Sequence, residues 1–291
     1  MPARPRPTIR LRRLAGALRR LRAEKELSRE DVSEATGINT ATLYRIENAR
    51  VRPQARTLAA MLTVYGVSGD ERTALTQLLK ESAQPGLLQA YADELPEEYS
   101  TYIEFEQEAR SVWNYESLFI PGLLQTEAYA RAVIPGTVPS YTRTQCDQRV
   151  KVRMERQEVL RRDQPLHLWA ICDEAALHRA VGGPKVMRDQ LLHLINAMEL
   201  PHVTLQVVDF ATGAHPGMPS SFVVMEFPND PQVVYIDSMA GDLFLEEEAE
   251  LRRYTGLFEY LRAFALNPDA TRQLLTRVAG EYQTKGEAGD G

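Results

Sequence analysis

The chain contains 291 residues, of which 44% are hydrophobic and 25% charged, and this is the balance of a folded chain long enough for two domains. Its 17 glycines and 17 prolines are close to average abundance, which excludes a collagen-like or wholly disordered chain. No apolar run approaches the roughly 18 residues that a membrane helix needs. The first residues lack the apolar stretch of a secretory signal, and two cysteines are too few for a disulfide framework. We therefore expect a cytoplasmic protein without a membrane segment.

The charge is distributed unevenly along the chain. Residues 1–65 contain 14 Arg and Lys against six Asp and Glu, a net charge of +8. Because the whole chain carries −6, the remaining residues carry −14. A basic head indicates contact with a polyanion such as DNA, whereas an acidic body would repel nucleic acid. The two parts are therefore expected to have different tasks.

Chain-breaking glycines and prolines, together with the periodicity of the apolar residues, divide the chain into four parts. Residues 1–8, rich in Pro and Arg, are predicted to be a disordered basic arm. Residues 9–83 predict a mainly α domain of five helices, which ends near the break at Gln84-Pro85-Gly86. Residues 84–282 predict an α+β domain with a small mixed sheet, and residues 283–291 a disordered tail.

The first two helices of the head have clear signals. One apolar stripe begins the domain and consists of Leu11, Leu14, Leu18 and Leu21. Ser28 is a favourable N-cap and Asp31 follows three residues later, as in a capping box. The second helix is expected to bury Val32 and Ala35 and to stop at Gly37, which supplies a left-handed conformation.

A third helix is predicted from Thr40 to about residue 48, capped by Asn39, with Leu43 and Ile46 facing inward. A fourth helix is predicted from Thr57 to Gly66, and a fifth over residues 70–82. Two short helices joined by a tight glycine-containing turn inside such a bundle are typical of a helix-turn-helix.

In this motif the N-terminal end of the second helix enters the major groove of DNA. Thr40 offers a hydroxyl to a base, Ala41 fits a thymine methyl, and Arg45 suits either a guanine edge or a phosphate. Tyr44 either contacts the DNA bases as these residues do or packs on the backbone. Three further arginines are placed for phosphates. The predicted DNA-binding residues are Arg29, Asn39, Thr40, Ala41, Tyr44, Arg45, Arg50 and Arg52.

The segment VSEATGINTATLYRIENARVRP resembles the XRE, or lambda-repressor-like, helix-turn-helix family. The resemblance implies that Glu47 is buried and that Glu47 and Asn48 hold the turn to the next helix. The family usually has glycine after that asparagine, where this chain has Ala49. The resemblance implies a lambda-repressor-like fold and binding to double-stranded DNA.

The body mixes helical and strand patterns. Helices are expected over residues 101–113, 125–134, 144–162, 184–198 and most of the last 45 residues. Four short apolar runs predict strands at residues 166–172, 203–208, 222–227 and 233–237. No common catalytic or phosphate-binding motif is present, so we expect no enzyme, no cofactor and no metal site.

Some residues of the body are candidates for a ligand site. Two loops, residues 209–217 and 237–242, lie at predicted strand ends, where sites are common, although both also suit plain turns. An aromatic group around residue 113 suits either a pocket or a core. Glu174 and His178 suit either a metal or a surface hydrogen bond. The ligand-binding candidates are Trp113, Tyr115, His215 and Asp237.

The body resembles the C-terminal domain of WhiJ-like, antitoxin-like transcriptional regulators, on segments such as PGLLQTEAYARAVI, LWAICDEAALHRAVGGPKVMRDQL and VVYIDSMAGDLFLE. The resemblance implies a DNA-binding regulator whose body senses a ligand or a small partner protein encoded by an adjacent gene. Because a single small head buries little surface and dimers match palindromic half-sites, we also expect a homodimer. The alternative is an antitoxin-like module that sequesters such a partner and autoregulates its operon.

Overall fold

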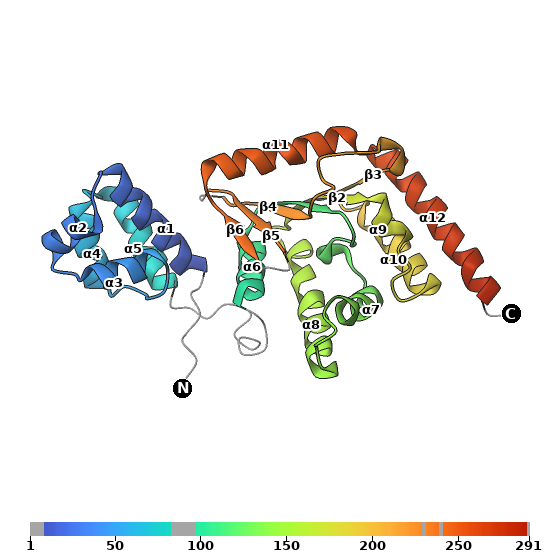
Figure 1. Cartoon of the computed structure of the whole chain (residues 1–291), viewed down its shortest axis with the longest axis horizontal. Coiled ribbons are helices and arrows are strands. Elements are labelled where there is room, and N and C mark those ends of the chain that lie inside the picture. The colour runs from blue at the N-terminus through green and yellow to red at the C-terminus, as the bar shows by residue number, and fades with distance from the viewer. Residues whose placement is uncertain (1–8, 83–96, 229–230, 239–240, 290–291) are drawn as a thin grey trace. The chain divides into compact units, whose positions relative to one another are not determined.

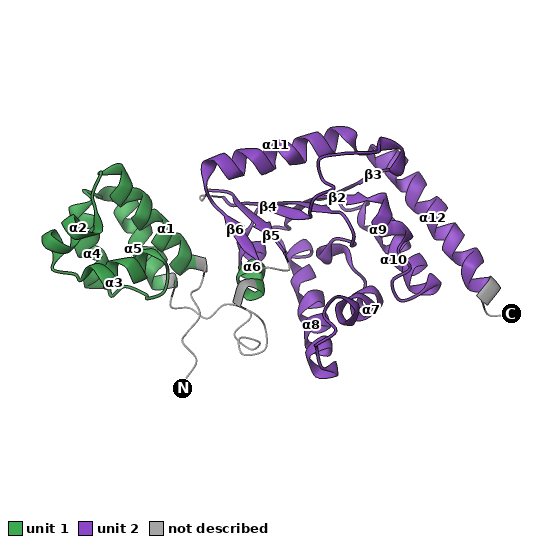
Figure 2. Ribbon diagram, in the orientation of Figure 1, with its two compact units in different colours: residues 1–104 green, residues 105–291 purple. Residues whose placement is uncertain are grey.

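The computed structural model describes residues 9–82, 97–228, 231–238 and 241–289. The chain forms two compact units, Met1–Glu104 and Phe105–Gly291 (Figure 2). The division falls within helix α6 (Glu97–Glu108), which is C-terminal to the break predicted at residues 84–86. That break and the predicted basic arm, residues 1–8, lie outside the described residues.

The described part of the first unit contains the five predicted helices, followed by the start of α6 (Figure 1). They are α1 (Ile9–Glu24), α2 (Arg29–Thr36), α3 (Thr40–Glu47), α4 (Ala55–Val64) and α5 (Gly69–Glu81). The fourth helix begins two residues before Thr57, because Gln54 occupies the N-cap position after Pro53. The expected mainly α head is therefore confirmed.

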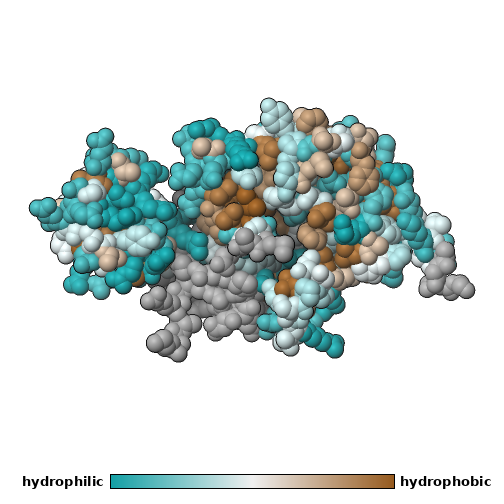
Figure 3. Space-filling model, in the orientation of Figure 1, coloured by the Kyte–Doolittle hydropathy of each residue, from teal (hydrophilic) through white to brown (hydrophobic). Residues whose placement is uncertain are grey.

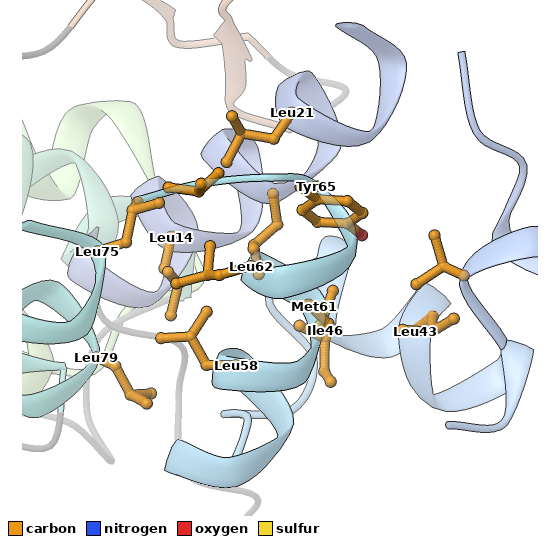
Figure 4. Packing of buried hydrophobic residues seen from close by; sticks show 13 residues of the cluster. Leu14, Leu21, Leu43, Ile46, Leu58, Met61, Leu62, Tyr65, Leu75 and Leu79 are labelled. Atoms are coloured by element: carbon orange, nitrogen blue, oxygen red, sulfur yellow. The ribbon is translucent and has the colours of Figure 1, made fainter. Parts of the chain in front are cut away.

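A single apolar cluster holds these helices together (Figure 4). The predicted stripe of α1 is buried along its whole length. Leu43 and Ile46 on α3 are buried too, and Figure 4 shows Ile46 beside Met61 of α4. Each such side chain contributes roughly 1.5–3 kcal/mol when it leaves water. This burial fixes one face of α3 and leaves the opposite face in solvent.

The caps of α2 and α3 set the turn between them. Ser28 accepts from the Asp31 amide and Asp31 accepts from the Ser28 amide, so the capping box is complete. Gly37 ends α2 with a φ of 70°. Asn39 caps α3 by accepting from the Ala41 amide at 2.9 Å. The expectation that Ala35 is buried is wrong, because the eight residues of α2 bury Val32 alone and Ala35 faces solvent.

The second unit is built on a mixed sheet, as expected, with six strands in the described residues in the order β3-β2-β1-β4-β5-β6. The strands are β1 (Ser111–Glu116), β2 (His167–Asp173), β3 (Val203–Val208), β4 (Phe222–Glu226), β5 (Val233–Ile236) and β6 (Leu243–Leu245). β1, β2 and β3 are parallel, and β4 to β6 continue the sheet antiparallel.

Two strands differ from the sequence expectation. The helix expected over residues 101–113 ends at Glu108, and β1 begins at Ser111 as a central strand. β1 is buried on both faces, so its residues do not alternate between apolar and polar. The three-residue β6, at the edge of the sheet, was likewise not predicted because it is too short to show a period.

Helices cover both faces of the sheet. The remaining helices are α7 (Glu127–Thr137), α8 (Arg143–Arg156), α9 (Glu174–His178), α10 (Pro184–Ala197), α11 (Glu248–Phe264) and α12 (Pro268–Gly289), with short 3-10 turns at Gly122–Leu124, Gln157–Leu160 and Phe210–Thr212. Figure 1 shows α11 along one side of the sheet and α7, α8 and α10 on the other.

The expectation of a disordered tail at residues 283–291 differs from the structure as far as Gly289, where α12 ends. The helix continues because Tyr282 is buried and its hydroxyl donates to the Leu177 carbonyl at 3.2 Å. Gln283 also donates to Glu287 one turn later at 3.2 Å.

Gly37 provides a test of the turn that positions α3. A Cβ added at Gly37 would meet nothing within 4 Å, so only the left-handed φ opposes a side chain. We expect Gly37→Ala to lower the free energy of unfolding by about 1–2 kcal/mol. Gly37→Asn should cost less, because asparagine tolerates this conformation. Urea denaturation of the full chain, followed by circular dichroism, measures both, and equal stability of all three proteins would contradict the assignment.

Candidate functional site

The outward face of α3 is the candidate DNA-binding surface of the first unit. Ala41, Tyr44 and Arg45 point to solvent, and Thr40 is half-buried at the start of the helix. Tyr44 is 42% exposed, although it is a large aromatic residue. The buried Leu43 and Ile46 hold the opposite face of the helix. The structure thus brings the predicted base-contacting residues together on one surface.

Arg45 lies back along its own helix. Its Nε donates to the Ala41 carbonyl at 3.2 Å, and Nη2 donates to the Thr42 hydroxyl at 3.3 Å. Both contacts are exposed and long, so they cost little to exchange for another acceptor. The guanidinium is therefore available on the same face as Tyr44.

Two arginines flank the ring of Tyr44. The guanidinium carbon of Arg29 lies 5.2 Å from the ring centroid, and that of Arg50 lies 5.6 Å from it. Each contact is worth about 0.5–1 kcal/mol at an exposed site. Residues from α2, from α3 and from the turn after it therefore form one cationic surface around an aromatic ring. We call Arg29, Tyr44 and Arg50 the arginine–tyrosine cluster.

Glu47 is the buried charge behind this surface. Its carboxylate accepts from Arg22 at 2.7 and 3.2 Å and from Arg29 at 2.7 Å. The hydrogen bond from Arg22 to Glu47 raises the pKa of that guanidinium, in spite of its partial burial. Glu47 itself is fully buried, as the resemblance implies, and it joins α3 to α1 and α2. Other residues hold the turn after α3.

That turn depends on Asn48 and Ala49. The Asn48 side chain donates to the Tyr44 carbonyl at 2.7 Å and so closes the end of α3. Ala49 follows with a φ of 53°, a left-handed conformation that favours glycine. This conformation explains why the XRE family, which this segment resembles, usually has glycine at this position. In this chain the Ala49 methyl group is buried in a small cluster with Leu11 and Ala15 of α1.

Arg52 contacts the end of α5. Its Nη2 donates to the Leu79 carbonyl at 2.6 Å, and its Nε donates to the Ser82 hydroxyl at 3.0 Å. These acceptors lie in the last turn of a helix, where carbonyl oxygens lack intrahelical partners. The residue predicted to hold a phosphate therefore also stabilises the five-helix bundle.

The four candidates in the second unit do not form one site. Trp113 stacks on Phe258 of α11 with centroids 5.5 Å apart, and Tyr115 is fully buried in the same cluster. Asp237 is exposed after β5. Tyr115 and His215 do meet, edge to face, with centroids 6.2 Å apart. The Tyr115 hydroxyl has no hydrogen-bond partner among the described residues, and burial raises its pKa.

His215 attaches the loop of residues 209–217 to the sheet. Its Nε2 lies 3.0 Å from Asp173 Oδ2 at the end of β2, and its Nδ1 accepts from the Gly217 amide. Nε2 therefore carries the proton in the neutral ring. A Cβ on Gly217 would lie 2.5 Å from Tyr115 Cζ, so only glycine fits beside that ring. The loop is thus held by specific contacts.

Glu174 fixes the same loop from α9. Its carboxylate accepts from the Phe210 amide at 2.8 Å and lies 3.1 Å from His178 Nε2. Of the two interpretations of Glu174 and His178, the structure supports the hydrogen bond. Among the described residues, no three His, Cys, Asp or Glu side chains are grouped to hold a metal ion.

A polar group beneath the sheet was missed by the sequence interpretation. Glu116 ends β1, and Asn114 Nδ2 lies 3.5 Å from its carboxylate. Burial raises the pKa of Glu116 to about 7, against the opposing effects of Ser221, Asn114 and Arg153. The Arg153 Nε is buried and has no hydrogen-bond partner in the described part of the chain. Recognising β1 as a strand would have indicated this group, since Asn114 and Glu116 then share a face.

Comparison with known families assigns both parts of the chain. A model described as a helix-turn-helix domain matches residues 13–75, so the first unit carries the fold of a class of DNA-binding regulators. A second model, described as a domain of unknown function (DUF5753), matches residues 99–277. The chain belongs to this family. Neither a curated protein nor a solved structure matches the chain. None of the described helices is long and apolar enough to cross a membrane.

Glu47 allows a test of how α3 is held. We expect Glu47→Gln to lower the free energy of unfolding by about 1–3 kcal/mol, because a neutral amide cannot balance two guanidinium groups. The exposed Glu34 on α2 is the matched control, and Glu34→Gln should be neutral. Urea denaturation of both full-length variants measures the difference. An unchanged stability of Glu47→Gln would show that the buried carboxylate does not hold α3.

Glu116 predicts a pH dependence of stability. Burial raises its pKa from 4.5 to about 7, so folding favours the protonated form. Its contribution is complete below the unfolded value and is lost as the pH rises through about 7. We expect Glu116→Gln to gain stability over the natural chain as the pH increases from about 4.5 to 7. Denaturation at several pH values tests this, with the exposed Glu158→Gln as control; parallel curves for natural chain and variant would contradict it.

Proposed function

We propose that this protein is a sequence-specific transcriptional regulator of the XRE type, in which α3 is the recognition helix. The observation that carries the proposal is the outward face of α3, where Tyr44 and Arg45 are exposed beside Arg29 and Arg50. The match of residues 13–75 to a helix-turn-helix domain supports it. The net charge of +8 over residues 1–65 supplies the attraction to a polyanion.

The proposed contacts follow from the position of each side chain. Thr40 and Ala41 lie at the N-terminal end of α3, which enters the major groove in this motif class, and Asn39 precedes them. Arg45, one turn further along, suits the O6 and N7 acceptors of guanine. The arginine–tyrosine cluster suits phosphates on the flank, since its cations need no fixed base partner.

A homodimer is part of the proposal. One five-helix domain presents a single short recognition helix, and regulators of this class bind two half-sites about 34–36 Å apart as dimers. A dimer would therefore recognise an inverted repeat. Two copies of the first unit also double the phosphate contacts, and affinity then falls steeply as the salt concentration rises.

The second unit is proposed to be the regulatory part, without enzyme activity, in a protein of the cytoplasm. It would sense a ligand or a small partner protein, as its resemblance to WhiJ-like regulators implies. For a small ligand, the unpaired hydroxyl of Tyr115 beside His215 and the partly buried polar group around Glu116 offer hydrogen bonds. Asp237, exposed at the end of β5, offers a carboxylate to the same class of ligand.

An antitoxin-like role is the alternative function. The residues after position 65 carry −14, which favours a basic partner protein. Phe210 in the loop held by His215 is 59% exposed, and Met218 directly after that loop is 63% exposed. Figure 3 shows apolar residues gathered at several places on the surface of the second unit. Co-purification with the product of an adjacent small gene would favour this alternative.

The decisive experiment is selection of DNA from a random duplex library by the full chain, followed by fluorescence anisotropy on the selected sequence at several salt concentrations. The proposal expects an inverted repeat, a specific affinity well above that for scrambled duplex, and a steep salt dependence. Equal affinity for selected and scrambled DNA would refute sequence-specific regulation by this chain alone.

Arg45→Ala tests the role of one side chain on that selected DNA. If Arg45 contacts guanine, we expect affinity to fall by about 1–3 kcal/mol and discrimination at that base pair to be lost. Arg161→Ala removes the same charge from an exposed site of the second unit and should leave both unchanged. An equal loss on every sequence would instead identify Arg45 as a phosphate contact.

A further inference from the structure

Helix α11 leaves large aromatic side chains in solvent. It packs on the sheet through Phe258 and Leu261, which are buried. On its outward side Tyr260 is 65% exposed and Phe264 is 50% exposed. These two residues are four positions apart and therefore lie on one stripe of the helix. Apolar exposure gathered on one helix face is a mark of an interaction surface.

Gly256 lies at the centre of this outward face, two positions before Phe258 and therefore on the side opposite to it. A glycine inside a helix is unfavourable compared with nearly every other residue. A Cβ at Gly256 would meet nothing within 4 Å in the described residues, and its φ is not left-handed. Packing within the unit therefore does not require glycine here. Close approach of a second helix backbone would require glycine at this position.

The charges on the same face are complementary to a second copy of the helix. In an antiparallel pair related by a two-fold axis at Gly256, residues whose distances before and after this position differ by one residue lie within about 1.5 Å of the same level along the axis. Arg252 is four residues before Gly256 and pairs with Glu248 in its own helix. Glu259 is three residues after Gly256 and pairs with Arg262. Arg252 then lies within one residue of the level of Glu259 of the second copy, on the same side of the seam, so the two can exchange these exposed partners for each other. By symmetry the same ion pair forms twice.

The other side of the pair has complementary chemistry too. Arg253, three residues before Gly256, lies within one residue of the level of Tyr260 of the second copy, four residues after, which suits a cation–π contact. The exposed Ala249 and Ala263 stand seven residues on either side and place small side chains opposite each other. Phe264 is then covered by Ala249 of the second copy.

We propose that the outward face of α11 is the homodimer interface of this protein, with two copies of α11 packed antiparallel across Gly256. This inference rests on the proposed dimeric regulator and names the surface that the dimer uses. The self-complementary order of Arg252, Gly256 and Glu259 identifies the occupant as a second copy of the chain. An unrelated partner would not need this symmetry.

Analytical ultracentrifugation of the full chain over a range of concentrations tests the interface. We expect the natural chain to be a dimer and Gly256→Arg to be a monomer at the same concentration. Gly280→Arg is the matched control, because Gly280 is an exposed glycine within α12 that also has open space around it. It should remain dimeric. Circular dichroism should show both variants folded, since arginine favours a helix more than glycine does.

Charge reversal tests the register. Arg252→Glu and Glu259→Arg should each raise the dimer Kd by about tenfold, because two exposed ion pairs become repulsive. The double variant reverses both members and should return the Kd to near its natural value. Failure of the double variant to recover while both single variants weaken the dimer would overturn the antiparallel pairing.

Two further outcomes would overturn the proposal: a natural chain that is monomeric at every concentration, or a Gly256→Arg variant that dimerises as the control does. Anisotropy on the selected DNA separates these from a failure of the proposed function. If α11 is the interface, Gly256→Arg loses affinity for the inverted repeat and keeps that for one half-site. If the variant binds the inverted repeat unchanged, DNA recognition stands and the α11 interface is wrong.

Discussion

The first unit depends on one buried carboxylate. Glu47 ends the exposed helix α3, yet its side chain turns inward to the guanidinium groups of Arg22 and Arg29. A buried charge must be compensated, so α1 and α2 have to present these arginines at fixed positions relative to α3. The apolar cluster supplies more of the stability, but apolar contacts alone specify direction poorly. The ion pairs determine which way the exposed face of α3 points.

Arg29 links this interior charge to the surface. One nitrogen of its guanidinium donates to Glu47, while the guanidinium carbon lies 5.2 Å from the centroid of the Tyr44 ring. A side chain that bridges core and surface loses its conformational freedom on folding, before any partner arrives. Preorganised cations bind a polyanion at a smaller entropic cost than flexible ones. The same residue therefore connects the stability of the bundle with the chemistry of its surface.

The sequence predicted the head far better than the body. The caps at Ser28 and Asn39 and the left-handed Gly37 are local signals, and they placed α2 and α3 almost to the residue. The arginine–tyrosine cluster was partly visible, since its members were all named. What could not be predicted was that Arg29 also binds Glu47, because that contact joins two helices, α2 and α3, across 18 residues.

In the body the missing information was tertiary. β1 is central in the sheet and buried on both faces, and such a strand lacks the alternation from which strands are recognised. Because β1 was not predicted, the group around Glu116 was missed, Trp113 was assigned to the end of a helix and Tyr115 was left outside every predicted element. Only the pairing of β1 with β2 and β4 shows that they share a core.

Both tryptophans of the chain, Trp113 and Trp169, pack against the same residue, Phe258 of α11. Arg262, also on α11, lies 4.5 Å above the Trp169 ring. The first unit contains no indole at all. Intrinsic tryptophan fluorescence therefore comes from the second unit alone. Because α11 packs against both indole rings, its position affects the polarity of their surroundings. Any event that shifts α11 on the sheet can be followed in this natural fluorescence without a label, and the first unit adds no tryptophan emission of its own.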